Sequence, residues 1–151
     1  REVSELYSNT PQANGISSIK VNGQLIQPPV QKGYAIIDRN WKSGDRIDLK
    51  LPMRVQRIKA SDKIEATRGQ VALRYGPLIY SAEAVDQDLD KILSPDASLI
   101  AEWKPDLLDG VMVIKGRWDD GSDFIAIPNY ARSNRLDKDG KVISTVWLKD
   151  Q

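Results

Sequence analysis

The sequence predicts an all-β chain that folds as an antiparallel β-sandwich of the jelly-roll kind. Alternation of apolar and polar residues with period two recurs from end to end, whereas helical spacing is scarce. Short turn signals separate the apolar runs, as in a sandwich, and these are Asn22-Gly23, Ser43-Gly44-Asp45, Asp120-Gly121 and Asp139-Gly140. A chain of 151 residues without an internal repeat or linker predicts a single domain spanning 1–151.

The first expected strands are 16–23, 33–39 and 45–55. In the third, Ile47, Leu49 and Leu51 alternate with charged residues and proline, so one face is apolar and the other polar. Pro52 lies on the polar side and cannot donate a hydrogen bond to a neighbouring strand. We therefore expect an edge strand, or a strand that bends at this proline.

The stretch 69–83, GQVALRYGPLIYSAE, changes its inward face at Gly76-Pro77. Val71, Leu73 and Tyr75 lie at odd positions, whereas the large apolar residues after the Gly-Pro pair lie at even positions. A bulge or bend changes the inward face of a strand, and glycine and proline are tolerated there. We therefore predict one long strand that bends at Gly76-Pro77 and continues into a second sheet.

Several of the later expected strands carry apolar residues at both odd and even positions, and therefore on both faces, which is typical of buried central strands. These strands are 110–118, 123–131 and 141–149. Between 84 and 109 the pattern is irregular. Val85, Leu89, Ile92 and Leu93 fit a short helix before Pro95, but an ordered loop is the expectation.

Composition excludes several kinds of site. The chain contains no cysteine and no histidine, which excludes Cys nucleophiles, Ser-His triads and the usual zinc, iron and copper sites, so we expect no cofactor in this chain. With 22 Lys and Arg against 21 Asp and Glu, it lacks the positive excess that nucleic-acid binding requires. No apolar run approaches the roughly 18 to 20 residues of a membrane span.

Exposed aromatic rings on a β-sandwich can stack against the apolar face of a sugar ring. The candidates for such a platform are Trp103 and Trp118, which flank predicted loops and turns, and Tyr130. Core packing is the alternative for the two tryptophans. It is the expectation for Trp41 and Trp147, which lie in or beside predicted strands.

The segment IPNYARSNR, 127–135, concentrates hydrogen-bond donors and planar groups. It suits a ligand or an interface with another domain, and an exposed polar loop is the alternative. Its candidate residues, besides Tyr130, are Asn129, Arg132, Asn134 and Arg135.

The acidic residues show no pairing that would identify a catalytic site. A glycosidase needs two carboxyl groups about 5 to 9.5 Å apart, and the acids here lie in turn-like contexts, so we expect most of them to be solvated. For Glu83 and Asp86, contact with another domain is left open. WDDGSD, 118–123, offers several oxygen ligands for calcium but lacks the spacing of an EF-hand, and an ordinary hairpin turn explains it equally well.

A series of sequence pieces follows the order typical of a known family: VNGQ, KGYAIIDRNWKSGDRIDLKLPMRV, VALRYGPLIYSAE, LLDGVMVIKG, IPNYARSNR and VWL. Over 19–148 the chain resembles the carboxyl-terminal β-sandwich region of glycoside hydrolase family 127, the β-L-arabinofuranosidase type. The turn at 41–45 and the Gly-Pro-Leu-Ile-Tyr stretch are its most specific pieces.

This resemblance implies a multidomain enzyme whose catalytic part is an upstream (α/α) barrel, with a cysteine nucleophile and a zinc held by cysteines and a glutamate. No catalytic or metal-binding residue of the family can be carried over to a chain without cysteine. We therefore expect a non-catalytic fragment, its sandwich lacking one edge strand, that packs on the barrel and helps to shape the active-site cleft.

The alternative is an autonomous carbohydrate-binding module that takes an oligosaccharide on its exposed Trp and Tyr side chains. This alternative predicts that the aromatics lie together on one face, whereas a supporting domain has no such requirement. The resemblance also implies export to the periplasm or the outside of the cell.

Overall fold

The computed structural model describes residues 5–11 and 15–151, which form strands and two short 3-10 helices, η1 (Glu65–Thr67) and η2 (Asn129–Ala131). All pairings between its strands are antiparallel. The predicted all-β, antiparallel class is confirmed. In the part of the chain that the structure describes, no helix is long and apolar enough to span a membrane.

The described residues divide into two compact units. The first unit comprises 15–53, and the second comprises 5–11 together with 54–151. The stretch expected to form a single domain, 1–151, therefore contains two compact parts. Residues 51–54 belong to no strand, and Pro52 among them has no N–H to offer a ladder, so the expected strand 45–55 is interrupted there.

The first unit consists of a small sheet and a separate hairpin, which lies between β3 (Gln24–Ile26) and β6 (Ile47–Lys50) in the chain. The three strands of the sheet lie in the order β3, β2 (Ser18–Val21) and β6. β4 (Val30–Gln31) and β5 (Tyr34–Ala35) form the separate hairpin. β6 is an edge strand of its sheet, as the proline predicted.

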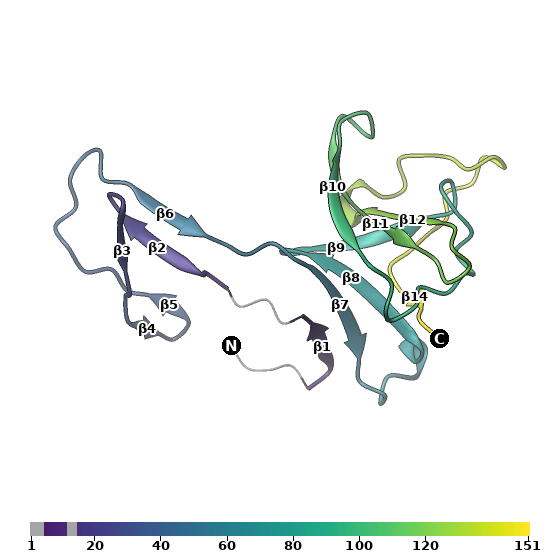
Figure 1. The fold of residues 1–151 in the computed structure, drawn as a ribbon, viewed down its shortest axis with the longest axis horizontal. Coiled ribbons are helices and arrows are strands. Elements are labelled where there is room, and N and C mark those ends of the chain that lie inside the picture. The colour runs from purple at the N-terminus through teal and green to yellow at the C-terminus, as the bar shows by residue number, and fades with distance from the viewer. Residues whose placement is uncertain (1–4, 12–14) are drawn as a thin grey trace. The chain divides into compact units, whose positions relative to one another are not determined.

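The second unit is built on one large sheet that curls around a core (Figure 1). The strands follow the order β1 (Tyr7–Thr10), β7 (Val55–Ala60), β8 (Gln70–Tyr75), β9 (Leu78–Glu83), β12 (Asp123–Pro128), β11 (Val111–Arg117) and β10 (Ile100–Lys104). Two short strands complete it: β13 (Ser144–Thr145) pairs with β9, and β14 (Leu148–Lys149) pairs with β8.

The main core of the second unit lies inside this curl. Its buried side chains come from β8, β9, β11, β12, β14 and adjoining loops, and they are Val71, Leu73, Tyr80, Ala82, Leu93, Ile114, Trp118, Phe124, Ala126 and Leu148. A smaller cluster on the other face of β11 and β12 consists of Val111, Val113, Ile127 and Ala131. These two strands are therefore buried on both faces, which explains their apolar residues on both parities.

The prediction of one long strand bent at Gly76-Pro77 is wrong, because β8 and β9 form a hairpin around this pair. Tyr75 lies opposite Leu78 in the ladder. Gly76 has a φ of +58°, which a two-residue hairpin turn with glycine in its first position requires. Opposed residues share a face, so a two-residue loop places odd positions of β8 beside even positions of β9. The hairpin itself produces the change of parity.

Between 84 and 109 the chain forms an ordered loop followed by β10, and the helix alternative is wrong. Leu93 is fully buried, and its N–H donates to the carbonyl oxygen of Lys149 at 2.8 Å. The Gln87 amide donates to the Ile125 carbonyl at 2.6 Å and accepts the Ile125 N–H at 3.0 Å. A side chain thus takes the place of a strand partner for this part of β12.

Candidate functional site

The loop that follows β12 is fixed to β9 by its polar side chains. Asn129, which starts η2, accepts a hydrogen bond from the buried Ser81 hydroxyl at 2.7 Å. Asn134 donates to the carbonyl oxygen of Ala131 at 3.0 Å, so it closes the loop on itself. Two of the predicted ligand or interface residues therefore hold the loop in place.

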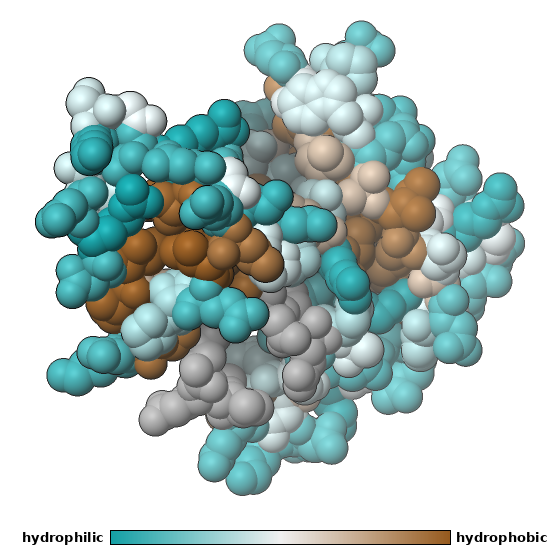
Figure 2. Space-filling view, turned by 60° about the vertical axis from the view of Figure 1, so that its left-hand side comes forward, coloured by the Kyte–Doolittle hydropathy of each residue, from teal (hydrophilic) through white to brown (hydrophobic). Residues whose placement is uncertain are grey.

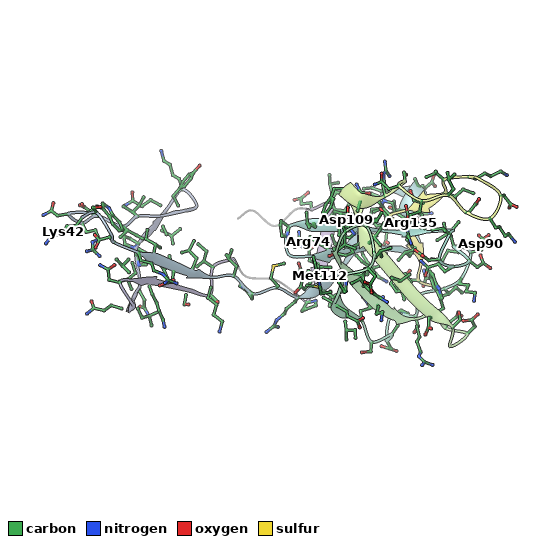
Figure 3. All side chains as sticks on the ribbon, turned by 90° about the horizontal axis from the view of Figure 1, so that it is seen from above. Lys42, Arg74, Asp90, Asp109, Met112 and Arg135 are labelled. Carbon is green, nitrogen blue, oxygen red and sulfur yellow. The ribbon has the colours of Figure 1, made fainter. Side chains whose placement is uncertain are left out.

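Arg135, labelled in Figure 3, joins this loop to two acids of the hairpin region. We call Glu83, Asp86, Ser133 and Arg135 the Arg135 cluster. The guanidinium donates to Glu83 Oε2 through Nη2 at 2.6 Å and Nε at 3.1 Å. Its Nη1 donates to Asp86 Oδ1 at 2.8 Å, and Nη2 also contacts the second oxygen of that carboxylate. The other oxygen of Glu83 accepts the Ser133 N–H at 2.6 Å.

Within this cluster, the ion pair between Arg135 and Glu83 is more buried than that between Arg135 and Asp86. The side chain of Glu83 is only 2% exposed, whereas those of Asp86 and Arg135 are 20% exposed. The hydrogen bonds that Arg135 donates to Asp86, and then those to Glu83, raise the pKa of Arg135, so the guanidinium stays charged. Both carboxylates are already bound by a cation of the same unit, which suits a structural cross-link and leaves neither free to act as a catalytic acid or base.

The proposed aromatic platform is not assembled in the structure. Trp118 is 2% exposed and packs edge-on against Phe124 with ring centroids 4.9 Å apart, so it belongs to the core and cannot stack on a sugar. Trp103 and Tyr130 are exposed at 56% and 68%. Trp118 is corrected accordingly: a turn after a strand does not imply exposure when the ring folds back over the core.

Trp103 and Tyr130 have different neighbours. Trp103 lies opposite Met112 in the ladder, and its ring covers the position where Gly110 would carry a Cβ. Tyr130 instead lines a hollow of about 400 Å³ with Val111 and Asn134. Gly110 also lines this hollow, and among the described residues no stacking contact joins the two rings.

The remaining predicted residues have simple environments. Arg132 is exposed on the loop. Trp147 is half-buried and stacks on Tyr7 at 6.5 Å, whereas Trp41, expected in the core, is 47% exposed with the Arg39 guanidinium 5.0 Å from its ring centroid. A cation–π contact with this guanidinium stabilises the exposed Trp41 ring without burial in the core.

WDDGSD forms a turn held by its own side chains. Asp120 accepts hydrogen bonds from the N–H and hydroxyl of Ser122, and Lys91 Nζ lies 2.8 Å from its other carboxylate oxygen. Lys91 and then Ser122 hold the pKa of Asp120 well below its ordinary value. Of the two alternatives, the geometry is that of the hairpin turn, and the described residues contain no group of acids placed to hold a metal ion.

A feature that sequence reasoning missed joins the two most characteristic turns of the first unit. Asn22 has a φ of +52° in the VNG turn, and its amide donates to Asp45 Oδ1 at 2.7 Å. Asp45 also accepts the Lys42 N–H at 2.9 Å, and Lys42 stands at the tip of this turn (Figure 3). These bonds, that of Asn22 first, lower the pKa of Asp45. The VNG and WKSGD turns are therefore held together by the hydrogen bond between Asn22 and Asp45.

A groove of about 830 Å³ runs along β10–β12 and the loop before β10. Apolar side chains such as Ile100 and Ile125 line it beside a Lys115–Glu102 ion pair at 2.9 Å. Its walls are mixed in character, and no convergent set of acids or donors distinguishes it as a catalytic site.

Two family models divide the chain between them. The model of the β-L-arabinofuranosidase GH127 middle domain matches residues 4–53, and that of the glycoside hydrolase family 127 C-terminal domain matches residues 55–149. The chain therefore belongs to glycoside hydrolase family 127, as the resemblance predicted. The two matches meet at the boundary that separates the compact units.

Known relatives are similar over much of this chain but are far longer. The non-reducing end β-L-arabinofuranosidase of Bifidobacterium longum is 32% identical over 107 residues, which are 66% of this chain and 16% of that protein. A solved GH127 β-arabinofuranosidase has a TM-score of 0.83 at 30% identity, covering 97% of this chain and 25% of its own. For the GH127 β-L-arabinofuranosidase of Geobacillus stearothermophilus T6 these values are 0.80, 32%, 97% and 27%.

Proposed function

We propose that this chain is the non-catalytic β region of a glycoside hydrolase that cleaves β-L-arabinofuranosides, and that it supports a catalytic domain elsewhere in the same polypeptide. The match over 97% of the chain to a β-arabinofuranosidase, of which the chain is only 25%, carries this proposal. The remaining three quarters of such a relative are long enough to contain a separate catalytic domain.

The side chains available in this chain support a non-catalytic role, with catalysis in another domain. Without cysteine or histidine it has neither a thiolate nucleophile nor an imidazole base. Its acids Glu83 and Asp86 are both ion-paired with Arg135. Asn129, Asn134 and Arg135 hold the loop 129–135 in place, and a loop held in this way offers a rigid surface for another domain to pack against.

Hydrolysis of chromogenic β-L-arabinofuranosides tests the proposal. The full-length protein is expected to release the chromophore, with α-L-arabinofuranosides and β-D-galactosides as the specificity controls. The 151-residue chain alone is expected to release none. Turnover by the chain alone, or a full-length protein that prefers another glycoside, contradicts the proposal.

A further inference from the structure

The first unit carries a pair of residues that is chemically unstable in an unfolded chain. The sequence contains two Asn-Gly pairs, Asn14-Gly15 and Asn22-Gly23. In such a pair the backbone nitrogen of the glycine can attack Cγ of the asparagine side chain, because glycine has no Cβ to hinder the approach. Asn22-Gly23 forms the tip of the β2–β3 hairpin, since Val21 pairs with Gln24. Asn14 lies outside the described residues.

The structure holds the Asn22 carboxamide by both of its polar atoms. Nδ2 donates to Asp45 Oδ1 at 2.7 Å, and Oδ1 accepts the Arg46 N–H at 2.8 Å. The Asn22 N–H also donates to the Arg46 carbonyl oxygen at 2.9 Å. The side chain is therefore not free to rotate toward the Gly23 nitrogen while these bonds last.

The backbone conformation of the turn opposes the same reaction. Asn22 has a φ of +52° and Gly23 a φ of +81°, as the two central residues of a type I′ turn require. Closure of a five-membered ring through the Gly23 nitrogen fixes the ψ torsion of Asn22 far from the left-handed region, where ψ lies at about +30 to +60°. The turn must therefore open before the ring can form.

Burial does not protect this turn from water. Residues 22–24 are exposed, and Figure 2, which brings the first unit forward, shows hydrophilic side chains along its margins. The conformation of the turn and the hydrogen bonds of Asn22 are therefore what keeps the pair unreactive.

We propose that Asn22 is a deamidation site that the folded turn protects and that loosens the first unit irreversibly once it has reacted. The Gly23 nitrogen bonds to Asn22 Cγ, the Cγ–Nδ2 bond breaks, and Nδ2 leaves as ammonia with the proton of the Gly23 N–H. A succinimide remains. Water then adds to one of its two carbonyl carbons and opens the ring, which gives aspartate or isoaspartate.

The modified residue cannot restore the contact with Asp45. Aspartate at position 22 has no N–H to donate, and its charge faces the Asp45 carboxylate where a hydrogen bond now joins the two side chains. Isoaspartate in addition inserts a carbon atom into the backbone of a two-residue turn, and the length of this turn sets the β2–β3 register. Either product therefore weakens the hairpin.

Peptide mapping of the full-length protein by mass spectrometry measures the protection. In urea, Asn22 and Asn14 are expected to deamidate at comparable rates. In the folded protein Asn22 is expected to react about a hundredfold more slowly than in urea, because two side-chain hydrogen bonds must first break. This comparison needs no variant, and a folded protein in which Asn22 reacts as fast as in urea would overturn the proposal.

Two variants test whether the contact with Asp45 provides the protection. Asp45→Ala removes one of the two side-chain bonds and is expected to speed deamidation of Asn22 in the folded protein by about tenfold. Asp48→Ala is the matched control, because Asp48 is bound by the Arg46 side chain and not by Asn22. Equal rates in the two variants would overturn the assignment of protection to Asp45.

Hydrogen exchange of the full-length protein tests the effect of the product. Asn22→Asp is expected to speed amide exchange in 18–26 by about tenfold, because repulsion replaces a hydrogen bond to a carboxylate. Combining Asn22→Asp with Asp45→Asn exchanges donor and acceptor between the two positions and is expected to bring exchange back near the wild-type rate. Unchanged exchange in Asn22→Asp, or a double variant that exchanges as fast as this single variant, would overturn the proposal.

Discussion

Replacement of Arg135 by alanine is expected to destabilise the second unit strongly. The substitution removes both donors from Glu83 Oε2, at 2.6 and 3.1 Å, and leaves only the Ser133 N–H on the other oxygen. With its side chain 2% exposed, Glu83 cannot replace these donors with water. Asp86, at 20% exposure, regains hydration and contributes little to the loss.

The magnitude follows from this difference in burial. Removing one partner of a buried ion pair costs about 3–5 kcal/mol, and the partial exposure of Arg135 places the expected loss near the lower end, at about 3 kcal/mol. With a urea slope of about 1.5–2 kcal/mol/M, the unfolding midpoint falls by about 1.5–2 M.

Urea unfolding followed by circular dichroism and tryptophan fluorescence measures this loss. Arg132→Ala is the matched control, because Arg132 is exposed on the same loop and its removal is expected to change stability by less than about 0.5 kcal/mol. Asp86→Ala is expected to cost about 1 kcal/mol or less. If Arg135→Ala costs no more than Asp86→Ala, the reasoning from Glu83 burial is refuted.

Three further outcomes are expected. Gly76→Ala costs about 1–2 kcal/mol in the same assay, because the φ of Gly76 is +58°; an unchanged midpoint would show that the turn tolerates a side chain. Asn22→Ala raises the pKa of Asp45 toward 3.8 in a carboxyl NMR titration; since the pKa is lowered in the folded state, the stability difference between wild type and variant is full above about pH 4 and shrinks as the pH falls through the folded-state pKa. Calorimetric titration of the chain with arabinose-, rhamnose- and galactose-containing oligosaccharides gives no saturable binding; saturable binding lost in Trp103→Ala would support the carbohydrate-binding module instead.

The sequence predicted the fold class because alternation and turn chemistry are local signals. It did not reveal the direction of the chain after Gly76-Pro77, since a bend and a two-residue hairpin give the same change of parity. β10 was missed because its large apolar residues, Ile100 and Trp103, are three positions apart and both are exposed. Its place in the sheet comes from pairing with β11, which no local pattern records.

The candidate residues divide in the same way. The segment 127–135 showed that these residues can donate hydrogen bonds. It could not show the partners of Arg135, which lie 49 and 52 residues away in the chain. Exposure of the tryptophans was equally hidden, because it depends on which strands close over each ring. Trp118 and Trp103 both lie beside turns, yet only the first packs into the core.

The supporting role of this region is tested most directly by removing it. The parent enzyme is produced without these 151 residues and assayed on a β-L-arabinofuranoside, alone and co-produced with the chain as a separate polypeptide. The shortened enzyme is expected to be insoluble or nearly inactive, and co-production is expected to restore activity. A shortened enzyme that is soluble and fully active would contradict the supporting role.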